Sequence, residues 1–156
     1  MPSNVDKVII ADTACLIGLA NIGQINLLKK MYGSIIITPE VAEEYGIALP
    51  EWIAVKAVSG ADKVAVFHKF IGLGESSAIA LTMETEDALL IVDDRRARQF
   101  ALNLGLEITG TLGLLIQAYQ KNIISDIDSI VASLREIGFR LPANAETLIS
   151  VIMSEK

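Results

Sequence analysis

The sequence predicts an α/β domain with a mostly parallel central sheet of about four to five strands. Short apolar runs rich in Ile and Val alternate along the chain with longer segments of helical periodicity. The apolar runs show no polar alternation, as expected of strands that are covered on both faces. The chain has 156 residues, of which 52% are hydrophobic, so it can bury one large core but is too short for two ordinary domains.

The expected strands are short and rich in β-branched residues, which favour extended structure. The segment that begins at Trp52 is expected to be an edge strand or an extended stretch, and the strand at 7–11 is expected to be buried. The expected strands cover residues 7–11, 34–38, 52–58, 88–93 and 106–110.

The segments between the strands are expected to form helices. Asp12 or Thr13 is the expected N-cap of the first helix. Gly72 and Gly74 are expected to separate the fourth helix from the fifth, so that Glu75 opens the fifth. The expected helices cover residues 12–23, 24–32, 39–49, 61–70, 75–86, 95–105, 111–122, 126–138 and 143–154.

The counts of cysteine and histidine exclude several kinds of site. Cys15 is the only cysteine and has apolar neighbours, so the chain has no internal disulfide or cysteine zinc cluster, and a buried core thiol is expected. His68 is the only histidine and is expected on a helix surface or half-buried. A single histidine excludes histidine-rich metal sites.

The charge and hydropathy of the chain argue against a nonspecific nucleic-acid binder, a membrane protein and a secreted protein. A formal net charge of −6 argues against a nonspecific nucleic-acid binder. It does not exclude an enzyme that cuts nucleic acid with metal ions, because a carboxylate site is itself negative. No apolar stretch reaches the ~18 residues of a membrane span, and the start, MPSNVDK, lacks the features of a signal peptide. A cytoplasmic protein without membrane contact is expected.

Acidic residues follow several of the predicted strands. In parallel α/β sheets, ligands bind beyond the carboxyl ends of the strands, near the point where the strand order reverses. If the strands are parallel, the acids that follow them converge at this edge. These acids are Asp12, Glu43, Glu44, Glu75, Asp93 and Asp94.

Each acid taken singly has a simple structural explanation. Asp is a good N-cap, and an acid in the first helical turn gains about 0.3–1 kcal/mol from the helix dipole. The set is harder to explain in this way, because converging carboxylates repel one another and raise each other's pKa unless a cation neutralises them. Oxygen ligands alone suit Mg²⁺ or Mn²⁺. The chemistry available to such a site is metal-assisted hydrolysis.

Five segments, in the correct order, resemble those of PIN domains, the nuclease fold of VapC-type toxins. They are DTACLIGLANIG, TPEVAEEY, LGESSAIALT, IVDDRRAR and ITGTLGLLIQAYQKNII. The tail, SLREIGFRLPANAETLISVI, is also similar to a prokaryotic branch of predicted nucleic-acid-binding PIN proteins. The resemblance covers nearly the whole chain. It implies one three-layer α/β/α domain over residues 1–156, with C-terminal helices (about 126–154) packed on it.

The resemblance implies a metal-binding and catalytic role for the acids. Asp12 matches the first family acid and Glu44 the second, with Glu43 as a substitute because the register in this helix can shift by one. Glu75 matches the third acid, where many VapC-type proteins have Asp. The fourth is Asp94 or Asp93. The implied catalytic residues are Asp12, Glu44, Glu75 and Asp94, and the implied metal ligands are Asp12, Glu44, Glu75, Asp93 and Asp94.

One residue departs from the family pattern. Many PIN domains have Thr or Ser just before the acid pair, where this chain has Val92, so the supporting role of that hydroxyl is in doubt. Thr13, next to the first acid, could take over this role. One member of the pair Asp93 and Asp94 would close the metal site, and the other would cap the next helix.

Three arginines follow the acid pair and are candidates for contacts to a phosphate backbone. An arginine near a helix start opposes the dipole, which favours a role beyond local stability. The alternative is a solvated helix face that pairs with Glu84, Glu86 or Asp87. The three arginines are Arg95, Arg96 and Arg98.

Together, the residues and the resemblance predict an endoribonuclease that uses Mg²⁺ or Mn²⁺ and hydrolyses RNA without a covalent intermediate. The toxins that it resembles imply an antitoxin partner, and the high apolar content predicts a homodimer. One alternative is a noncatalytic PIN-like module that binds nucleic acid or protein in a regulatory role. Another is a phosphoacceptor domain of the receiver type, which needs a lysine after a late strand. This chain instead has Thr111 and Leu112 there.

Overall fold

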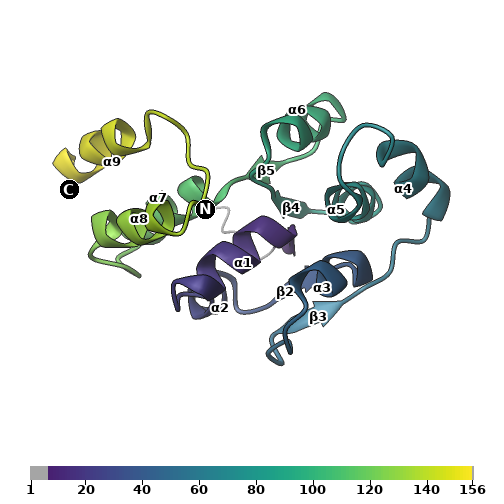
Figure 1. Cartoon of the computed structure of the whole chain (residues 1–156), viewed down its shortest axis with the longest axis horizontal. Helices are drawn as coiled ribbons and strands as arrows, with labels where there is room; N and C mark the ends of the chain where they lie inside the picture. Colours follow the sequence, from purple (N-terminus) through teal and green to yellow (C-terminus); the bar gives the residue numbers. More distant parts are fainter. Residues whose placement is uncertain (1–6, 156) are drawn as a thin grey trace.

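The computed structural model describes residues 7–155, in which five strands form one sheet in the order β3-β2-β1-β4-β5 (Figure 1). Every pairing between neighbouring strands is parallel. The predicted α/β class with a mostly parallel sheet is confirmed, and the third strand lies at an edge as predicted. The strands are β1 (Val8–Ala11), β2 (Ile35–Ile37), β3 (Ile53–Val55), β4 (Ala88–Ile91) and β5 (Ile108–Thr109).

Helices cover both faces of this sheet and complete three layers. Figure 1 shows α1, α2, α7, α8 and α9 on one side and α4, α5 and α6 on the other. In the described part of the chain the helices are α1 (Thr13–Asn21), α2 (Asn26–Tyr32), α3 (Pro39–Tyr45), α4 (Ala61–Phe67), α5 (Leu73–Met83), α6 (Arg95–Asn103), α7 (Thr111–Gln120), α8 (Ile127–Glu136) and α9 (Ala145–Ser154). Most of the segment considered for a signal peptide (1–6) lies outside the described residues.

Alternate residues of the central strands enter two separate cores, because successive side chains of a strand point to opposite faces. In β1, Ile9 and Ala11 join the core shared with α1, α2 and the C-terminal helices, whereas Ile10 joins the core shared with α5 and α6. Burial on both faces explains why these strands are continuously apolar. Cys15 is 1% exposed in the first core, so its prediction as a buried thiol is confirmed.

The order of the strands reverses between β1 and β4, at the centre of the sheet. The chain runs outward from β1 to β3 and then returns to place β4 on the other side of β1. Ala11 pairs with Ile91 in the last register step, and the Asp12 N–H donates to the Ile91 carbonyl at 3.0 Å. Because both strands end at the same edge, the acids that follow them emerge side by side.

The start of α5 differs from the sequence prediction. The helix begins at Leu73, so Glu75 is its third residue and Gly74 lies inside it. The Gly72 N–H donates to Glu75 Oε1 at 3.0 Å. This contact satisfies a backbone donor at the helix start, which has no partner within the helix. Glu75 therefore stabilises the first turn from its third position.

Several helices end earlier than the sequence predicted, among them α3 and α4. The α3 helix ends at Tyr45 because Gly46 takes a left-handed conformation with φ of 69° and closes the helix. The α4 helix ends at Phe67 and is followed by a turn rather than by the three further helical residues that were predicted. The loop after α4 leads directly into α5.

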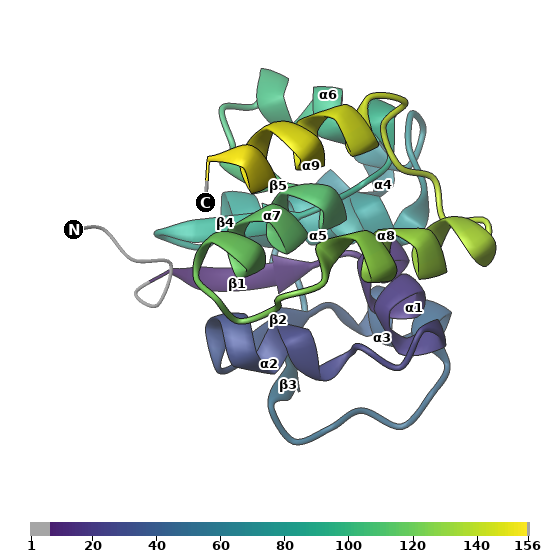
Figure 2. The ribbon, with the colours of Figure 1, turned by 90° about the vertical axis from the view of Figure 1, so that its left-hand side faces the viewer.

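The C-terminal helices α7, α8 and α9 lie together in front of one face of the sheet (Figure 2). An ion pair between Arg135 and Glu146, with Nε and Oε1 2.5 Å apart, joins α8 to α9. The Phe139 ring, in the connection between these helices, packs directly on Gly18 of α1. A Cβ at position 18 would lie 2.6 Å from that ring, so the absence of a side chain permits the contact. No helix between residues 7 and 155 has the length and hydropathy needed to cross a membrane.

The contact between Gly18 and Phe139 predicts an unusual response to alanine. Gly18→Ala should lower the free energy of unfolding by about 1–3 kcal/mol, because the added methyl displaces the ring. In a Phe139→Ala background the same change should be neutral or stabilising by up to about 1 kcal/mol, since alanine is the better helix former. Urea unfolding of the four proteins of this double-mutant cycle measures both effects. Equal effects in the two backgrounds would contradict the contact.

Candidate carboxylate site

Asp12 is the most buried acid of the predicted set. Its side chain follows β1, is 3% exposed, and does not cap α1. Its Oδ1 atom is buried and receives no hydrogen bond. Burial raises the pKa of Asp12 to about 7, and the negative charges of Glu75, Glu44 and Asp93 add to the increase. A buried carboxylate oxygen without a donor is costly, so this atom is the main sign of a cation site.

Glu44, near the end of α3, lies beside Asp12 and is fixed by two donors. The Thr13 hydroxyl donates to Glu44 Oε1 at 2.5 Å, and the Gly74 N–H donates to Oε2 at 3.1 Å. A Cβ at position 74 would collide with the Glu44 carboxylate, so glycine is required for this approach. Glu43 is exposed. The Thr13 hydroxyl donates to Glu44 and not to Glu43, and Glu43 is not among the charges that raise the pKa of Asp12. Of the two glutamates, Glu44 is the one that the structure brings to the site.

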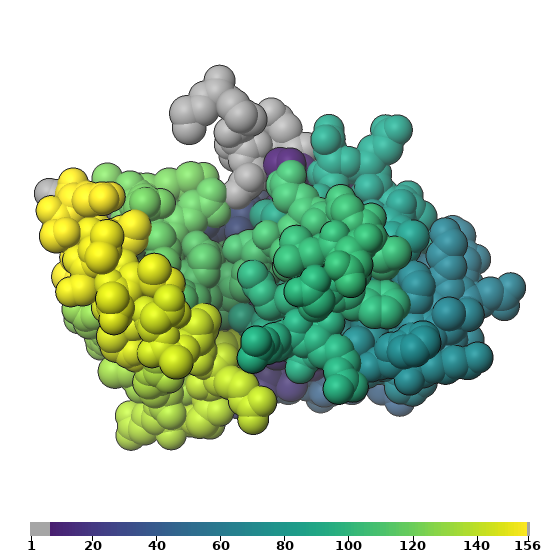
Figure 3. Space-filling model, turned by 90° about the horizontal axis from the view of Figure 1, so that it is seen from above, coloured from purple at the N-terminus to yellow at the C-terminus, as the bar shows by residue number. Residues whose placement is uncertain are grey.

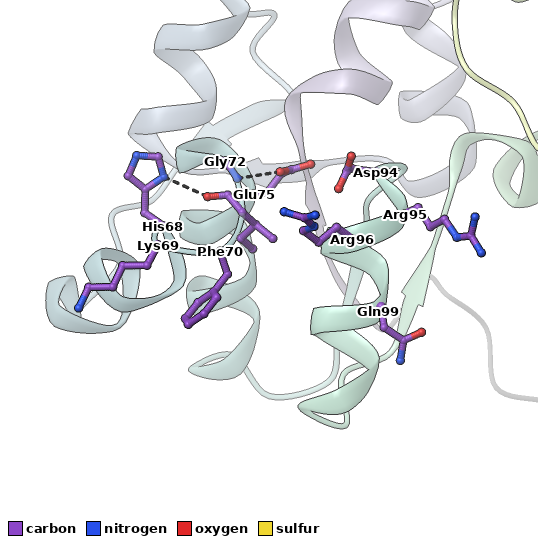
Figure 4. Close-up of a pocket in the computed structure, with 10 residues that line it drawn as sticks. His68, Lys69, Phe70, Gly72, Glu75, Asp94, Arg95, Arg96 and Gln99 are labelled. Atoms are coloured by element: carbon purple, nitrogen blue, oxygen red, sulfur yellow. Dashed lines mark hydrogen bonds between the residues drawn. The ribbon is translucent and has the colours of Figure 1, made fainter.

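Glu75 and Asp94 face one another at the edge of an open pocket (Figure 4). Burial raises the pKa of Glu75, and the negative charge of Asp94 raises it further. Asp94 is the N-cap of α6 and accepts a hydrogen bond from the Ala97 N–H at 3.0 Å through Oδ2. Among the described residues, no hydrogen bond reaches Glu75 Oε2 or Asp94 Oδ1. Each side chain therefore keeps one oxygen available to a ligand.

Asp93 is held differently from its neighbour. It accepts hydrogen bonds from the backbone N–H and the hydroxyl of Thr111, at 2.8 and 2.7 Å. Burial raises the pKa of Asp93, while these bonds and the charge of Arg98 oppose the increase. Asp93 therefore ties the start of α7 to the end of β4, and Asp94 caps α6.

The three arginines separate into one structural residue and two exposed ones. Arg98 is half-buried and donates from Nη1 to the Val92 carbonyl at 2.9 Å. Arg95 and Arg96 are exposed beside the acids, and Figure 4 shows Arg96 turned toward Glu75 and Asp94 and Arg95 turned away. None of the three forms an ion pair with Glu84, Glu86 or Asp87. The alternative of a paired helix face is not what the structure shows.

Two pockets flank the acids and share four of their lining residues. The first, of about 1010 Å³, lies between the loop after α4 and the start of α6. The second, of about 1270 Å³, lies between α1, α6, α7 and the α8–α9 connection. Figure 3 shows α9 in yellow and α6 in green as neighbouring lobes of the surface. The shared residues are Glu75, Asp94, Arg95 and Gln99.

The donor chemistry of the site fits a divalent cation. Within residues 7–155, no three Asp, Glu, Cys or His side chains stand close enough together to hold a metal ion in their present rotamers. The buried Oδ1 of Asp12 nevertheless lacks a partner, and within the same described residues no hydrogen bond reaches Glu75 Oε2 or Asp94 Oδ1. A set of carboxylate oxygens suits Mg²⁺ or Mn²⁺, whose charge would offset their repulsion.

The sequence analysis missed two residues that shape this site. Gly74 was interpreted as a helix breaker, but it makes room for Glu44 and binds its carboxylate. Thr111 was considered only because it replaces a lysine, but it holds Asp93 through two hydrogen bonds. A hydroxyl residue directly after a strand was the available signal for Thr111. No local signal marks Gly74, because its partner lies 30 residues away in the sequence.

The structure is a parallel α/β sheet with carboxylates gathered where its strand order reverses, an arrangement that suits metal-assisted hydrolysis. A family model described as a PIN domain matches residues 8–155, so the chain belongs to the PIN-domain family. PIN domains are generally nucleases and typically use divalent metals. No curated protein and no solved structure matches the chain.

The raised pKa of Asp12 predicts that stability depends on pH. Folded Asp12 keeps its proton up to about pH 7, whereas the unfolded side chain releases it near pH ~3.9. In EDTA, the native state should therefore lose stability as the pH rises from about 4 to 7, by up to about 4 kcal/mol. Asp12→Asn should flatten this dependence and be more stable than the wild type at pH ~8.

Thermal or urea unfolding between these pH values, in EDTA, measures the effect. Asp62→Asn, at an exposed position of α4, is the matched control and should keep the wild-type pH dependence. A wild-type slope in the Asp12→Asn protein would show that Asp12 is ionised in the folded state across this range.

Proposed function

We propose that this protein is a metal-dependent endoribonuclease that hydrolyses RNA phosphodiester bonds. The buried Asp12 carboxylate carries the proposal, because its Oδ1 atom has no donor and neighbouring acids repel its charge. Such an arrangement is stable in an ionised form only when a cation is present. Membership of the PIN-domain family supports the same chemistry.

Asp12, Glu44, Glu75 and Asp94 would hold Mg²⁺ or Mn²⁺, with Asp93 beside them. A bound divalent ion supplies a nucleophilic water and polarises the phosphoryl oxygen. Thr13 and Gly74 fix the Glu44 carboxylate, and Gly72 fixes Glu75 Oε1, so each side chain presents a defined orientation. This support keeps the carboxylates in place while they repel one another.

The exposed arginines would position the RNA backbone at the acids. Arg95 and Arg96 lie at the opening of the site and form no ion pair with any acid of residues 7–155, and arginine binds phosphate oxygens well. Arg98 would not contact RNA directly. Its guanidinium is bound to the Val92 carbonyl, and its positive charge would act on Asp93. These charges offset locally the net charge of −6, which otherwise repels RNA.

The partners implied by the resemblance belong to the same proposal. A toxin role would require an antitoxin protein, and both would act in the cytoplasm. A homodimer would bury exposed apolar side chains such as Val151 of α9, which is 51% exposed. Residues 1–156 as one domain would be the unit that assembles.

One observation favours the noncatalytic alternative, a PIN-like binding module with a regulatory role. Both oxygens of Glu44 and both oxygens of Asp93 are already engaged by donors of the protein. If these bonds persist, fewer carboxylate oxygens remain for a metal. Titration with millimolar Mn²⁺ separates the two functions, because the nuclease should show calorimetric heat and a raised Tm.

Cleavage of a mixed RNA pool by the purified protein tests the proposed function. Cleavage should require Mn²⁺ or Mg²⁺ and stop in EDTA. Asp12→Asn should lower the rate by more than about a hundredfold, because even outer-sphere partners of a metal cost about 10–100-fold. The variant should remain folded, since it replaces a buried carboxylate, which neighbouring negative charges repel, with a neutral group of the same shape.

Asp128→Asn, at an exposed position of α8, is the matched control and should cleave at the wild-type rate. Equal rates for wild type and Asp12→Asn in a clean preparation would remove Asp12 from the catalytic site. A wild-type protein that neither binds metal nor cleaves RNA would favour the binding module.

A further inference from the structure

The first pocket beside the acids contains an exposed aromatic ring that the proposed catalytic site does not use. Phe70, in the loop between α4 and α5, lines the pocket and is 58% exposed. Arg96 and Glu75 line the same pocket, so the ring shares this pocket with an exposed arginine and with a proposed metal ligand. Large exposed apolar side chains beside a polar pocket commonly mark a binding surface.

Phe70 is held in place although it is exposed. Its ring centroid lies 6.2 Å from that of Phe100 on α6, with the planes at 31°. Phe67 contacts Phe100 from another side at 5.1 Å and 70°, an edge-to-face arrangement. The three rings form a cluster that supports Phe70 on one side, while much of its surface faces solvent.

The loop that carries Phe70 contains one internal hydrogen bond and is tied to Glu75 by a second. His68 Nδ1 lies 3.0 Å from the Ile71 carbonyl, and because a carbonyl only accepts, Nδ1 carries the proton. The Gly72 N–H donates to Glu75 Oε1. Figure 4 shows both bonds, with Phe70 on the side of the opening that faces away from Asp94. The ring therefore has a fixed position relative to the proposed site of cleavage.

We propose that this pocket binds one unpaired nucleotide of single-stranded RNA, next to the phosphodiester bond that is cut. The base stacks on Phe70, and Arg96 contacts the adjoining phosphate. The inference rests on the proposed function, because the acids define which bond lies beside the pocket. A paired base has both faces covered by its neighbours, so only an unpaired base can use the ring.

Binding of a short fluorescein-labelled RNA without self-complementarity, followed by anisotropy in EDTA, tests the subsite without cleavage. Phe70→Ala should weaken binding about five- to hundredfold, the usual effect of removing one stacking platform. Phe70→Leu keeps an apolar side chain against Phe100 but has no ring, and should bind as weakly. Phe70→Trp should bind at least as well as the wild type.

A matched control and a duplex distinguish stacking from a general loss of structure. Val66→Ala removes a side chain that is 50% exposed on α4 and does not line the pocket, so its affinity should stay within twofold of the wild type. The duplex of the same RNA should bind all variants equally. In a Trp52→Phe background, single-stranded RNA should quench the fluorescence of Phe70→Trp, and the duplex should not.

Arg96→Gln tests the phosphate contact separately. It should weaken binding to single-stranded RNA of every sequence and reduce the slope of log K against log salt by about 1. Lys121→Gln, at an exposed position after α7, is the control and should leave the slope unchanged.

Wild-type affinity in both Phe70→Ala and Phe70→Leu would overturn the subsite, as would an equal loss of binding to the duplex. If cleavage still depends on Asp12 in that case, the proposed nuclease function stands without this subsite. If the wild type cleaves no RNA but binds single strands through Phe70, the subsite stands and the nuclease function falls.

Discussion

The parallel pairing of β1 with β4 brings Asp12 next to the acids that end β4. Ala11 lies opposite Ile91, so the chain leaves both strands at the same level of the sheet. A shift of this register by one residue would turn every side chain of β1 to the opposite face and exchange the two cores. The same pairing thus fixes the packing of both helical layers and the position of the proposed site.

The bonds that hold the acids at this edge also keep several negative charges close together. Glu44 is held from α1 and α5, and Asp93 from α7. Each bond costs flexibility and places negative charge close to Asp12, whose burial already opposes ionisation. A fold selected for stability alone would remove such repulsion. Strain of this kind is expected where a site is organised for a ligand.

The sequence was sufficient for features that depend on local pattern. The apolar runs located all five strands, and the acids after the strands located the edge where they gather. The sequence could not decide between Glu43 and Glu44, because that choice depends on how α3 is rotated relative to Thr13 and Gly74. The roles of the two consecutive aspartates likewise depend on Thr111, which lies at the start of α7.

The arrangement of β1 and β4 also has a consequence for how the molecule forms. Val8 pairs with Ala88, so the centre of the sheet joins two strands that are separated in the chain by β2, β3 and five helices. Contacts between residues so far apart in the sequence make folding slow, because closing a long loop costs conformational entropy before the new contact stabilises the structure. Helices such as α1 and α5 can form early, but the acids meet only when the last central strand joins. A newly synthesised or partly folded chain therefore has no assembled site, and activity would appear together with the native state.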